Sequence, residues 1–330
     1  MKLPQCQDRL IEEVLKVQPN VVVVLHNGSP VELPWADRVS AILEMYLGGQ
    51  GVGEACDWLL YGEANPSGRL AETFPYRLED NPSYLHFPGN GKRVLYGEDI
   101  FVGYRYYDTK KVPVRYAFGH GLSYTEFAYE DLNLSSAQMT DEDILTVSFK
   151  VKNTGKTEGK EVVQLYVADL CGISERPVKE LKGFAKVHLL PGEEKTVSME
   201  ISARNLSYYE ERLGDWYAPS GTYRILIGHA SDDIRLHADI VFETQKELPL
   251  RVDFTTTFGE LLDHTKTAPV ITELLAPLAA AAASAEGMSD EYKKLGEQVI
   301  REMPMKSLLG QMPGEQVEQL IGQLNCLLAQ

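Results

Sequence analysis

The sequence predicts a mixed fold in three parts: a partial α/β domain with a parallel sheet, an all-β sandwich and an α-helical C-terminal extension. Unalternated apolar runs at 21–25 (VVVVL) and 41–47 (AILEMYL) alternate with helical stretches, which is typical of strands in a parallel sheet. Residues 126–245 alternate apolar and polar with period two, as antiparallel strands do. Residues 246–330 return to helical spacing.

The first 75 residues contain the α/β elements. Residues 7–17 have helical spacing, with Leu10, Val14 and Val17 on one apolar stripe. The run VVVVL that follows Pro19 predicts a strand buried on both faces. A helical stretch near 35–40, the strand AILEMYL and a helix opened by GGQGVGEA and ending near Leu60 complete the order. So few strands make an incomplete sheet, and we expect the start of this domain to be missing.

Three further segments follow. Residues 76–125 are rich in aromatics, glycine and proline and are interpreted as a connecting segment packed over a surface. The alternating runs of 126–245, separated by turn signals such as NTGKTEG and PGEE, predict the antiparallel sandwich. In residues 246–330, Thr257 and Glu260 predict a capping box at a helix start. An alanine-rich run and two amphipathic stretches, SDEYKKLGEQVIREM and GEQVEQLIGQLNCLL, predict the helices after it.

Composition excludes several classes of function. The 330 residues carry a formal net charge of -16, which disfavours binding to nucleic acid or to anionic membrane surfaces. The four cysteines are widely spaced and form no CxxC pair, so we expect neither a zinc site nor a disulfide scaffold. Cys56 and Cys326 lie among apolar residues and are expected to be buried.

Localisation is expected to be cytoplasmic. The cysteine pattern fits reducing surroundings, and residues 1–20 lack the basic start, apolar run and cleavage site of a signal peptide. If the chain is a fragment, a signal would lie on the part upstream of it.

Single motifs are weak indicators of chemistry here. The glycines of GGQGVGEA precede a helix, but their spacing is not that of a nucleotide-binding loop, and a tight strand-to-helix turn is the favoured interpretation. His26 and Asn27 follow a predicted strand, at the edge where open α/β sheets bind ligands. They are therefore candidate substrate-proximal residues, with a turn that caps the next segment as the alternative. The scattered histidines lack the HExxH spacing, so no metal site or cofactor is expected.

Longer segments, read together, are more specific. The sequence resembles family 3 glycoside hydrolases of the β-glucosidase type in LPQCQDRLIEEVLKVQPNVVVVLHNGSPVELPW and in GGQGVGEACDWLLYGEANPSGRLAETFP. VLYGEDIFVGYRYYD and AFGHGLSYTEF resemble that family's junction into a fibronectin type III-like domain, and RPVKELKGFAKVHLLPGE with GTYRILIG resemble that domain itself. One position departs from the pattern: Gln50 stands where many members have glutamate.

The resemblance implies a retaining glycosidase that acts on β-linked glucosides. A (β/α)8 barrel would supply the Asp nucleophile, and an E-G-x-D-R motif just before an LP dipeptide would supply the Glu acid/base. Here the dipeptide is Leu3-Pro4, preceded only by Met1 and Lys2. The chain therefore contains neither carboxylate, no catalytic residue is assigned to it, and we expect it to be inactive without its barrel partner.

The sandwich would also suit a second class of function, a free-standing carbohydrate-binding or adhesion module, because a fold does not dictate a function. The α/β elements of residues 1–75 favour the glycosidase, since a binding module has no need of part of a parallel sheet.

Overall fold

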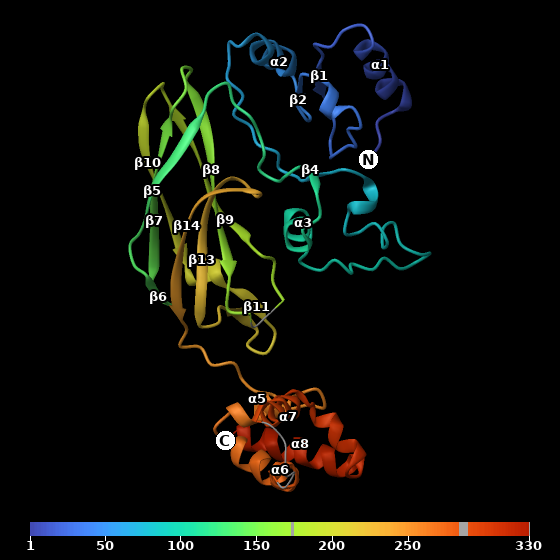
Figure 1. The fold of residues 1–330 in the computed structure, drawn as a ribbon, viewed down its shortest axis with the longest axis vertical. Helices are drawn as coiled ribbons and strands as arrows, with labels where there is room; N and C mark the ends of the chain where they lie inside the picture. Colours follow the sequence, from blue (N-terminus) through green and yellow to red (C-terminus); the bar gives the residue numbers. More distant parts are fainter. Residues whose placement is uncertain (173–174, 284–289, 330) are drawn as a thin grey trace. The chain divides into compact units, whose positions relative to one another are not determined.

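The computed structural model describes residues 1–172, 175–283 and 290–329. The described chain forms two compact units: one holds Met1–Tyr208 with Trp216–Gln245, and the other holds Tyr209–Asp215 with Lys246–Gln330. The first contains the α/β elements and the sandwich, and the second contains the C-terminal helices (Figure 1). No helix of the described residues has the length and apolar character needed to cross a bilayer.

The α/β part of the first unit is built on a parallel strand pair. Strand β1 (Val22–Leu25) pairs in parallel with β2 (Ala41–Glu44), and Leu25 lies opposite Glu44. This confirms the parallel sheet predicted from the two apolar runs. Its other elements are the helices α1 (Gln5–Leu15) and α2 (Val52–Tyr61) and the 3-10 turn Ala36–Arg38. A small core forms around the fully buried Trp35, together with Leu25, Val31, Leu33 and Phe74.

Two expectations for this part are wrong. Strand β1 is not buried on both faces: Val22 is 50% exposed, because β2 is the only strand that pairs with β1 among the described residues. Helix α1 does not pack through Leu10, Val14 and Val17, which are all exposed. It uses the neighbouring stripe of Ile11 and Leu15, which packs on the Trp35 core.

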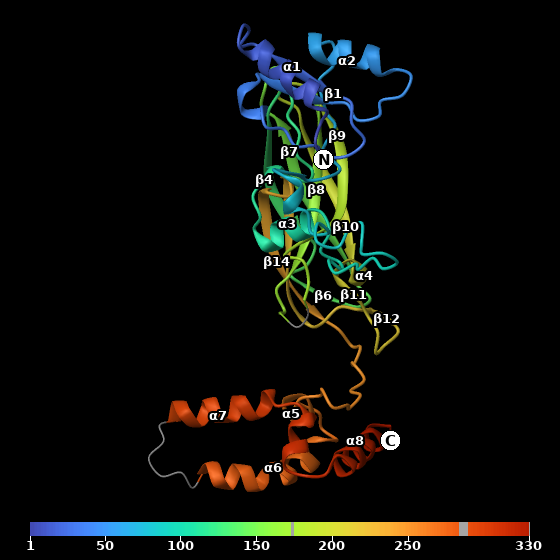
Figure 2. The same cartoon turned by 90° about the vertical axis from the view of Figure 1, so that its right-hand side faces the viewer.

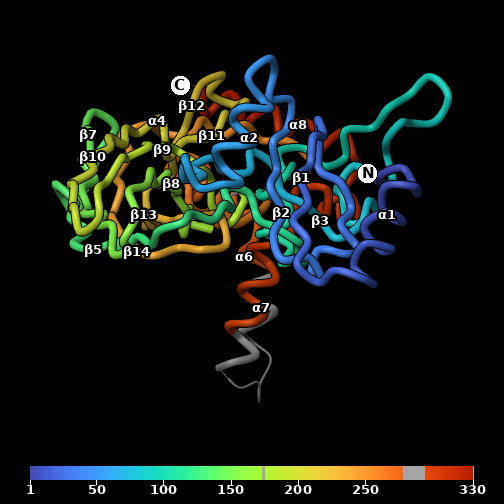
Figure 3. Tube along the Cα trace, turned by 90° about the horizontal axis from the view of Figure 1, so that it is seen from above, coloured from blue at the N-terminus to red at the C-terminus, as the bar shows by residue number. Residues whose placement is uncertain are grey.

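The connecting segment has some regular structure. Strand β3 (Phe74–Pro75) pairs antiparallel with β4 (Val114–Tyr116), which closes residues 76–113 into a long excursion. The excursion contains the 3-10 turn Leu78–Asp80 and helix α3 (Tyr104–Lys110). Between them the chain runs outward, as the teal loop of Figure 3 shows.

The sandwich consists of two sheets, which lie side by side in Figure 1 and one behind the other in Figure 2. Their strand orders are β10-β7-β5 and β6-β14-β13-β8-β9. All pairs are antiparallel except the short parallel pair β6–β14. The strands of these sheets are β5 (Phe127–Leu134), β6 (Gln138–Thr140), β7 (Ile144–Asn153), β8 (Gly159–Asp169), β9 (Glu180–Leu189), β10 (Glu194–Ser202), β13 (Gly221–Ala230) and β14 (Asp233–Glu243). Between β10 and β13 lie the short helix α4 (Ala203–Leu206) and the strands β11 (Tyr208–Glu210) and β12 (Asp215–Tyr217), which form a separate two-stranded sheet.

The period-two pattern produces the core of the sandwich. Along β7, every second side chain from Leu145 to Asn153 is buried. The inward side chains of both sheets form one apolar cluster, which includes Phe149, Tyr223 and Phe242. The predicted sandwich is therefore confirmed, because alternation places one face of each sheet against the other.

The second unit is helical and has its own core. Its helices are α5 (Phe258–Asp263), α6 (Ala268–Ala283), α7 (Asp290–Glu302) and α8 (Gly314–Leu328), with a 3-10 turn at Met305–Gly310. The predicted capping box is present: Thr257 Oγ1 accepts from the Glu260 N–H, and the Glu260 carboxylate accepts from the Thr257 N–H. The end of the alanine-rich run and the start of the SDEYKK stretch lie outside the described residues.

The cysteines correct one more expectation. All four are free thiols. Cys56 is only half-buried and Cys326 is exposed, although their apolar sequence neighbours predicted burial. Cys326 lies on α8, whose core-facing residues are Val317 and Leu324. It therefore falls on the outer side of that helix.

Limited trypsin digestion is expected to cut first between the two units. Residues 244–253 have no regular structure, and Lys246 and Arg251 lie on this stretch with exposed side chains. Backbone bonds outside strands and helices open at the least cost and are cleaved preferentially. Mass spectrometry should find the helical C-terminal unit released as a stable fragment by cuts after Lys246 or Arg251. Early cleavage at Lys150, Lys160 or Lys186, inside the strands, would contradict this division.

Candidate functional site

Polar side chains gather at the carboxyl ends of β1 and β2. His26 and Asn27 follow β1 directly; His26 is exposed and Asn27 is half-buried. The Asn27 amide nitrogen donates to the Ser29 carbonyl at 2.8 Å, a short-range bond of the kind that shapes a turn. Asn27 therefore fits the turn interpretation, and the substrate-proximal role of both residues stays a prediction.

Glu44 and Tyr46 lie beside this pair. Oε1 of Glu44 accepts from the Tyr46 N–H at 2.8 Å. Burial raises the pKa of Glu44, and burial together with the nearby Glu44 and Glu72 carboxylates raises the pKa of Tyr46 to about 12. Three buried atoms here have no hydrogen-bond partner among the described residues: Asn27 Oδ1, Glu44 Oε2 and Tyr46 Oη. Buried polar atoms are rarely left unpaired, so this edge is suited to receive hydrogen bonds from another group.

A cavity of about 710 Å³ lies close to this edge. Ser29 and Pro30 form part of its wall, and Glu72, whose charge acts on Glu44 and Tyr46, forms another part. Residues of the connecting segment and helix α3 form most of the rest, including Tyr84, Phe87, Tyr104 and Tyr107, and Met1 and residues 71–75 also contribute. Concave sites with aromatic walls and a few polar groups are the usual form of small-molecule sites.

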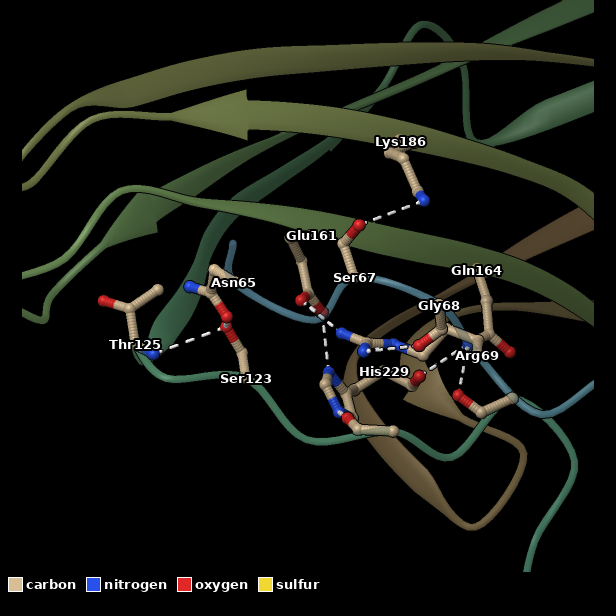
Figure 4. A network of polar contacts seen from close by, with 12 residues as sticks. Asn65, Ser67, Gly68, Arg69, Ser123, Thr125, Glu161, Gln164, Lys186 and His229 are labelled. Atoms are coloured by element: carbon tan, nitrogen blue, oxygen red, sulfur yellow. Dashed lines mark hydrogen bonds and ion pairs between the residues drawn. The ribbon is translucent and has the colours of Figure 1, made fainter. Parts of the chain in front are cut away.

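A buried ion pair joins the segment PSGRL to the sandwich (Figure 4). Arg69 Nη2 lies 2.6 Å from Glu161 Oε2, and the two side chains are only 6% and 0% exposed. The other oxygen of Glu161 accepts from the Tyr129 hydroxyl at 2.6 Å and lies 2.6 Å from His229 Nδ1. Burial and the Glu161 charge raise the pKa of Tyr129 far above its usual value.

The same network fixes the segment that enters the sandwich. His229 Nε2 lies 2.9 Å from the Gly121 carbonyl, and the Gln164 amide donates to the carbonyls of Gly119 and His229. Gly119 has a φ of +82°, and a Cβ there would lie 2.2 Å from the Gln164 side chain, so the FGHG turn needs glycine at this position.

A second anchor lies beside it, around Asn65. Asn65 donates to the Glu158 carbonyl and accepts from Ser123 and from the Tyr124 N–H. Together with the ion pair, these bonds hold residues 65–69 and 119–124 on the sandwich. Since Glu161 has no exposed surface and is committed to three partners, it is a structural carboxylate and is unsuited to general acid/base work.

Of the polar residues at the strand ends, His26 and Asn27 were predicted from the sequence, and Glu44 and Tyr46 were missed. Glu44 carried a signal, because it is a charged residue that ends an otherwise apolar strand. Glu161 also opens an apolar run, EVVQLYVADL, and the alternation of that run places it inside. Its partners Arg69 and His229 lie 92 and 68 residues away along the chain, so sequence spacing gave no indication of the pairing.

Comparisons with known proteins agree with this architecture. Residues 1–124 match the Glycosyl hydrolase family 3 C-terminal domain, and residues 161–231 match the Fibronectin type III-like domain. The chain is 46% identical, over 329 residues, to thermostable beta-glucosidase B of Acetivibrio thermocellus, and the match covers 98% of this chain and 43% of that protein.

Solved structures give the same result. The beta-glucosidase of Kluyveromyces marxianus, determined in complex with glucose, aligns with a TM-score of 0.70 and 43% identity over 74% of this chain and 29% of its own. A family 3 beta-glucosidase of Bifidobacterium adolescentis aligns with a TM-score of 0.75 and 38% identity, over 82% and 40%. The chain thus spans less than half the length of these relatives. It belongs to glycosyl hydrolase family 3 and corresponds to the C-terminal part of its β-glucosidase-type members, with the fibronectin type III-like domain included.

Proposed function

We propose that the chain acts as the C-terminal part of a β-glucosidase, giving structural support and one wall of an active site that a (β/α)8 barrel completes. Its substrates would be β-linked glucosides, hydrolysed by a pair of carboxylates of which this chain supplies neither. One observation carries the proposal: the parallel sheet ends, on its carboxyl side, in buried polar atoms that have no hydrogen-bond partner among the described residues.

The alternative of a free-standing binding module is less well supported. The sandwich has a complete apolar core of its own, so such a module would need neither β1 nor β2. The exposed apolar side chains of α1 and β1 also suit a surface that another part of an enzyme covers.

Complementation tests the proposal. The partner is the N-terminal portion of the Acetivibrio thermocellus relative, running to the point where its match to this chain begins. The chain alone and the partner alone are each expected to leave an aryl β-glucoside intact, and the co-expressed pair is expected to hydrolyse it. Removing either catalytic carboxylate costs several orders of magnitude in rate, so the contrast should be large.

Controls make the result specific. Trp35→Ala removes the centre of the α/β core and is expected to abolish complementation, whereas Phe184→Ala, on an exposed position of β9, is expected to leave it intact. Hydrolysis by the purified chain alone would contradict the proposal, and so would a soluble but inactive pair.

A further inference from the structure

We propose that the 710 Å³ cavity beside the strand ends binds a sugar ring, at a site that lies wholly on this chain. Its walls come from Met1, from Ser29 and Pro30, from residues 71–88 and 103–107, and from Phe118. All of these belong to the first unit. The site does not need the barrel, so the sugar-binding proposal can be tested independently of the proposed catalytic role.

Aromatic rings supply the apolar surface of the site. Tyr104 and Phe118 stack with ring centroids 4.7 Å apart, and Tyr107 beside them is only 4% exposed. Tyr84 and Phe87 are 42% and 74% exposed, so their rings are accessible. A pyranose ring presents axial C–H groups on its faces, and these pack against the flat apolar surface of an aromatic side chain.

Polar groups supply the complement for hydroxyls. Thr73 is only 6% exposed, and its buried Oγ1 has no hydrogen-bond partner among the described residues. A hydroxyl can donate one hydrogen bond and accept others. A buried one without a partner is destabilising, so Thr73 is suited to bind a ligand that both donates and accepts.

Two further residues widen this polar set. Glu72 is exposed and forms no ion pair within the described parts of the chain. The side-chain oxygen of Asn81 accepts from the N–H and hydroxyl of Ser83. Its amide nitrogen is left to donate, since it has no partner within the described ranges. An acceptor, a donor and a hydroxyl within one cavity suit a polyhydroxylated ring.

Other ligand chemistries fit less well. The cavity wall has no lysine, arginine or histidine side chain, so no cationic side chain would pair with a phosphate or carboxylate ligand, and the negative charge of Glu72 would repel it. A purely apolar ligand would bury Thr73 and Asn81 without hydrogen bonds. A neutral sugar can pack its C–H faces against the aromatic rings and form hydrogen bonds with the polar groups.

Titration of the full 330-residue chain with glucose and with cellobiose tests the proposal. Tyrosine and tryptophan fluorescence or protein NMR should show saturable binding, with a dissociation constant on the order of 1–10 mM because an open cavity buries only part of one ring. Phe87→Ala is expected to weaken binding at least tenfold. Thr73→Val keeps the shape of the side chain and should weaken binding several-fold.

Phe184→Ala is the matched control. Phe184 is 70% exposed on β9, much as Phe87 is 74% exposed, so its loss removes a similar ring and should leave the affinity unchanged. Thermal melting checks that each variant is folded. The proposal is overturned by wild-type chain that shows no saturation, by Phe87→Ala and Thr73→Val variants that bind as wild type does, or by an equal loss in Phe184→Ala. No barrel is present, so none of these outcomes bears on the complementation test.

Discussion

The Glu161→Gln variant is expected to lose about 3–5 kcal/mol of unfolding free energy, because it leaves the buried Arg69 guanidinium without a counter-charge. The side chains of both residues are almost fully excluded from water. The Tyr129 hydroxyl and His229 also lose a charged acceptor at this point. Urea unfolding followed by tryptophan fluorescence measures the change as a lower transition midpoint.

The matched control is an exposed ion pair of the same sandwich. Arg224 and Asp239 lie 2.6 Å apart on β13 and β14, with side chains about 40% exposed. Because solvent screens such a pair, Asp239→Asn should cost no more than about 1 kcal/mol. Equal effects of the two substitutions would mean that the Arg69–Glu161 pair contributes no more than a surface pair.

A double substitution separates lost pairing from lost packing. Arg69→Met with Glu161→Leu removes both charges and keeps most of the side-chain volume, so it should restore much of the stability lost in Glu161→Gln. A double variant that is less stable than the single one would show instead that the hydrogen bonds of Glu161 to Tyr129 and His229 dominate.

Local patterns predicted the fold well where they determine which side chains face the core. Alternation along β7 requires a buried face whatever the partner sheet is. The capping box of Thr257 and Glu260 depends only on residues three apart. Helix α1 failed because two adjacent apolar stripes were available, Leu10–Val14 and Ile11–Leu15. Only tertiary packing on Trp35 selects between them.

The site was predictable only in part, for a related reason. His26 and Asn27 could be placed because a strand end is visible in the sequence. The pairing of Glu161 with Arg69 and His229 depends on how the connecting segment runs over the sandwich. The cavity likewise depends on the β3–β4 pair, which brings Phe74 opposite Tyr116 across 42 residues of chain. No short-range pattern encodes such a contact.

The purified chain is expected to self-associate through the α/β part of its first unit. On α1, Leu10 is 64% exposed and Val17 85% exposed, and Val22 on β1 is 50% exposed. Exposed apolar surface of this kind favours association, and a short parallel pair with open strand edges offers backbone groups to another chain. The net charge of -16 opposes close approach, so association should strengthen as salt screens that charge.

Light scattering over a range of protein concentration and salt measures this association. The variant Leu10→Gln, Val14→Gln, Val17→Gln removes the exposed stripe of α1 without changing the charge, and its mean mass should fall toward that of a monomer. The matched control, Phe184→Gln with Val241→Gln, removes two exposed apolar side chains of the sandwich and should associate as wild type does.

A wild-type chain that stays monomeric at every concentration would show that these exposed side chains do not drive association. A control that dissociates as fully as the α1 variant would place the contact on the sandwich instead. The outcome also bears on complementation. A barrel portion that covers the α1 stripe should suppress the self-association of the wild-type chain. It should have little effect on the association of the α1 variant, which has already lost that stripe.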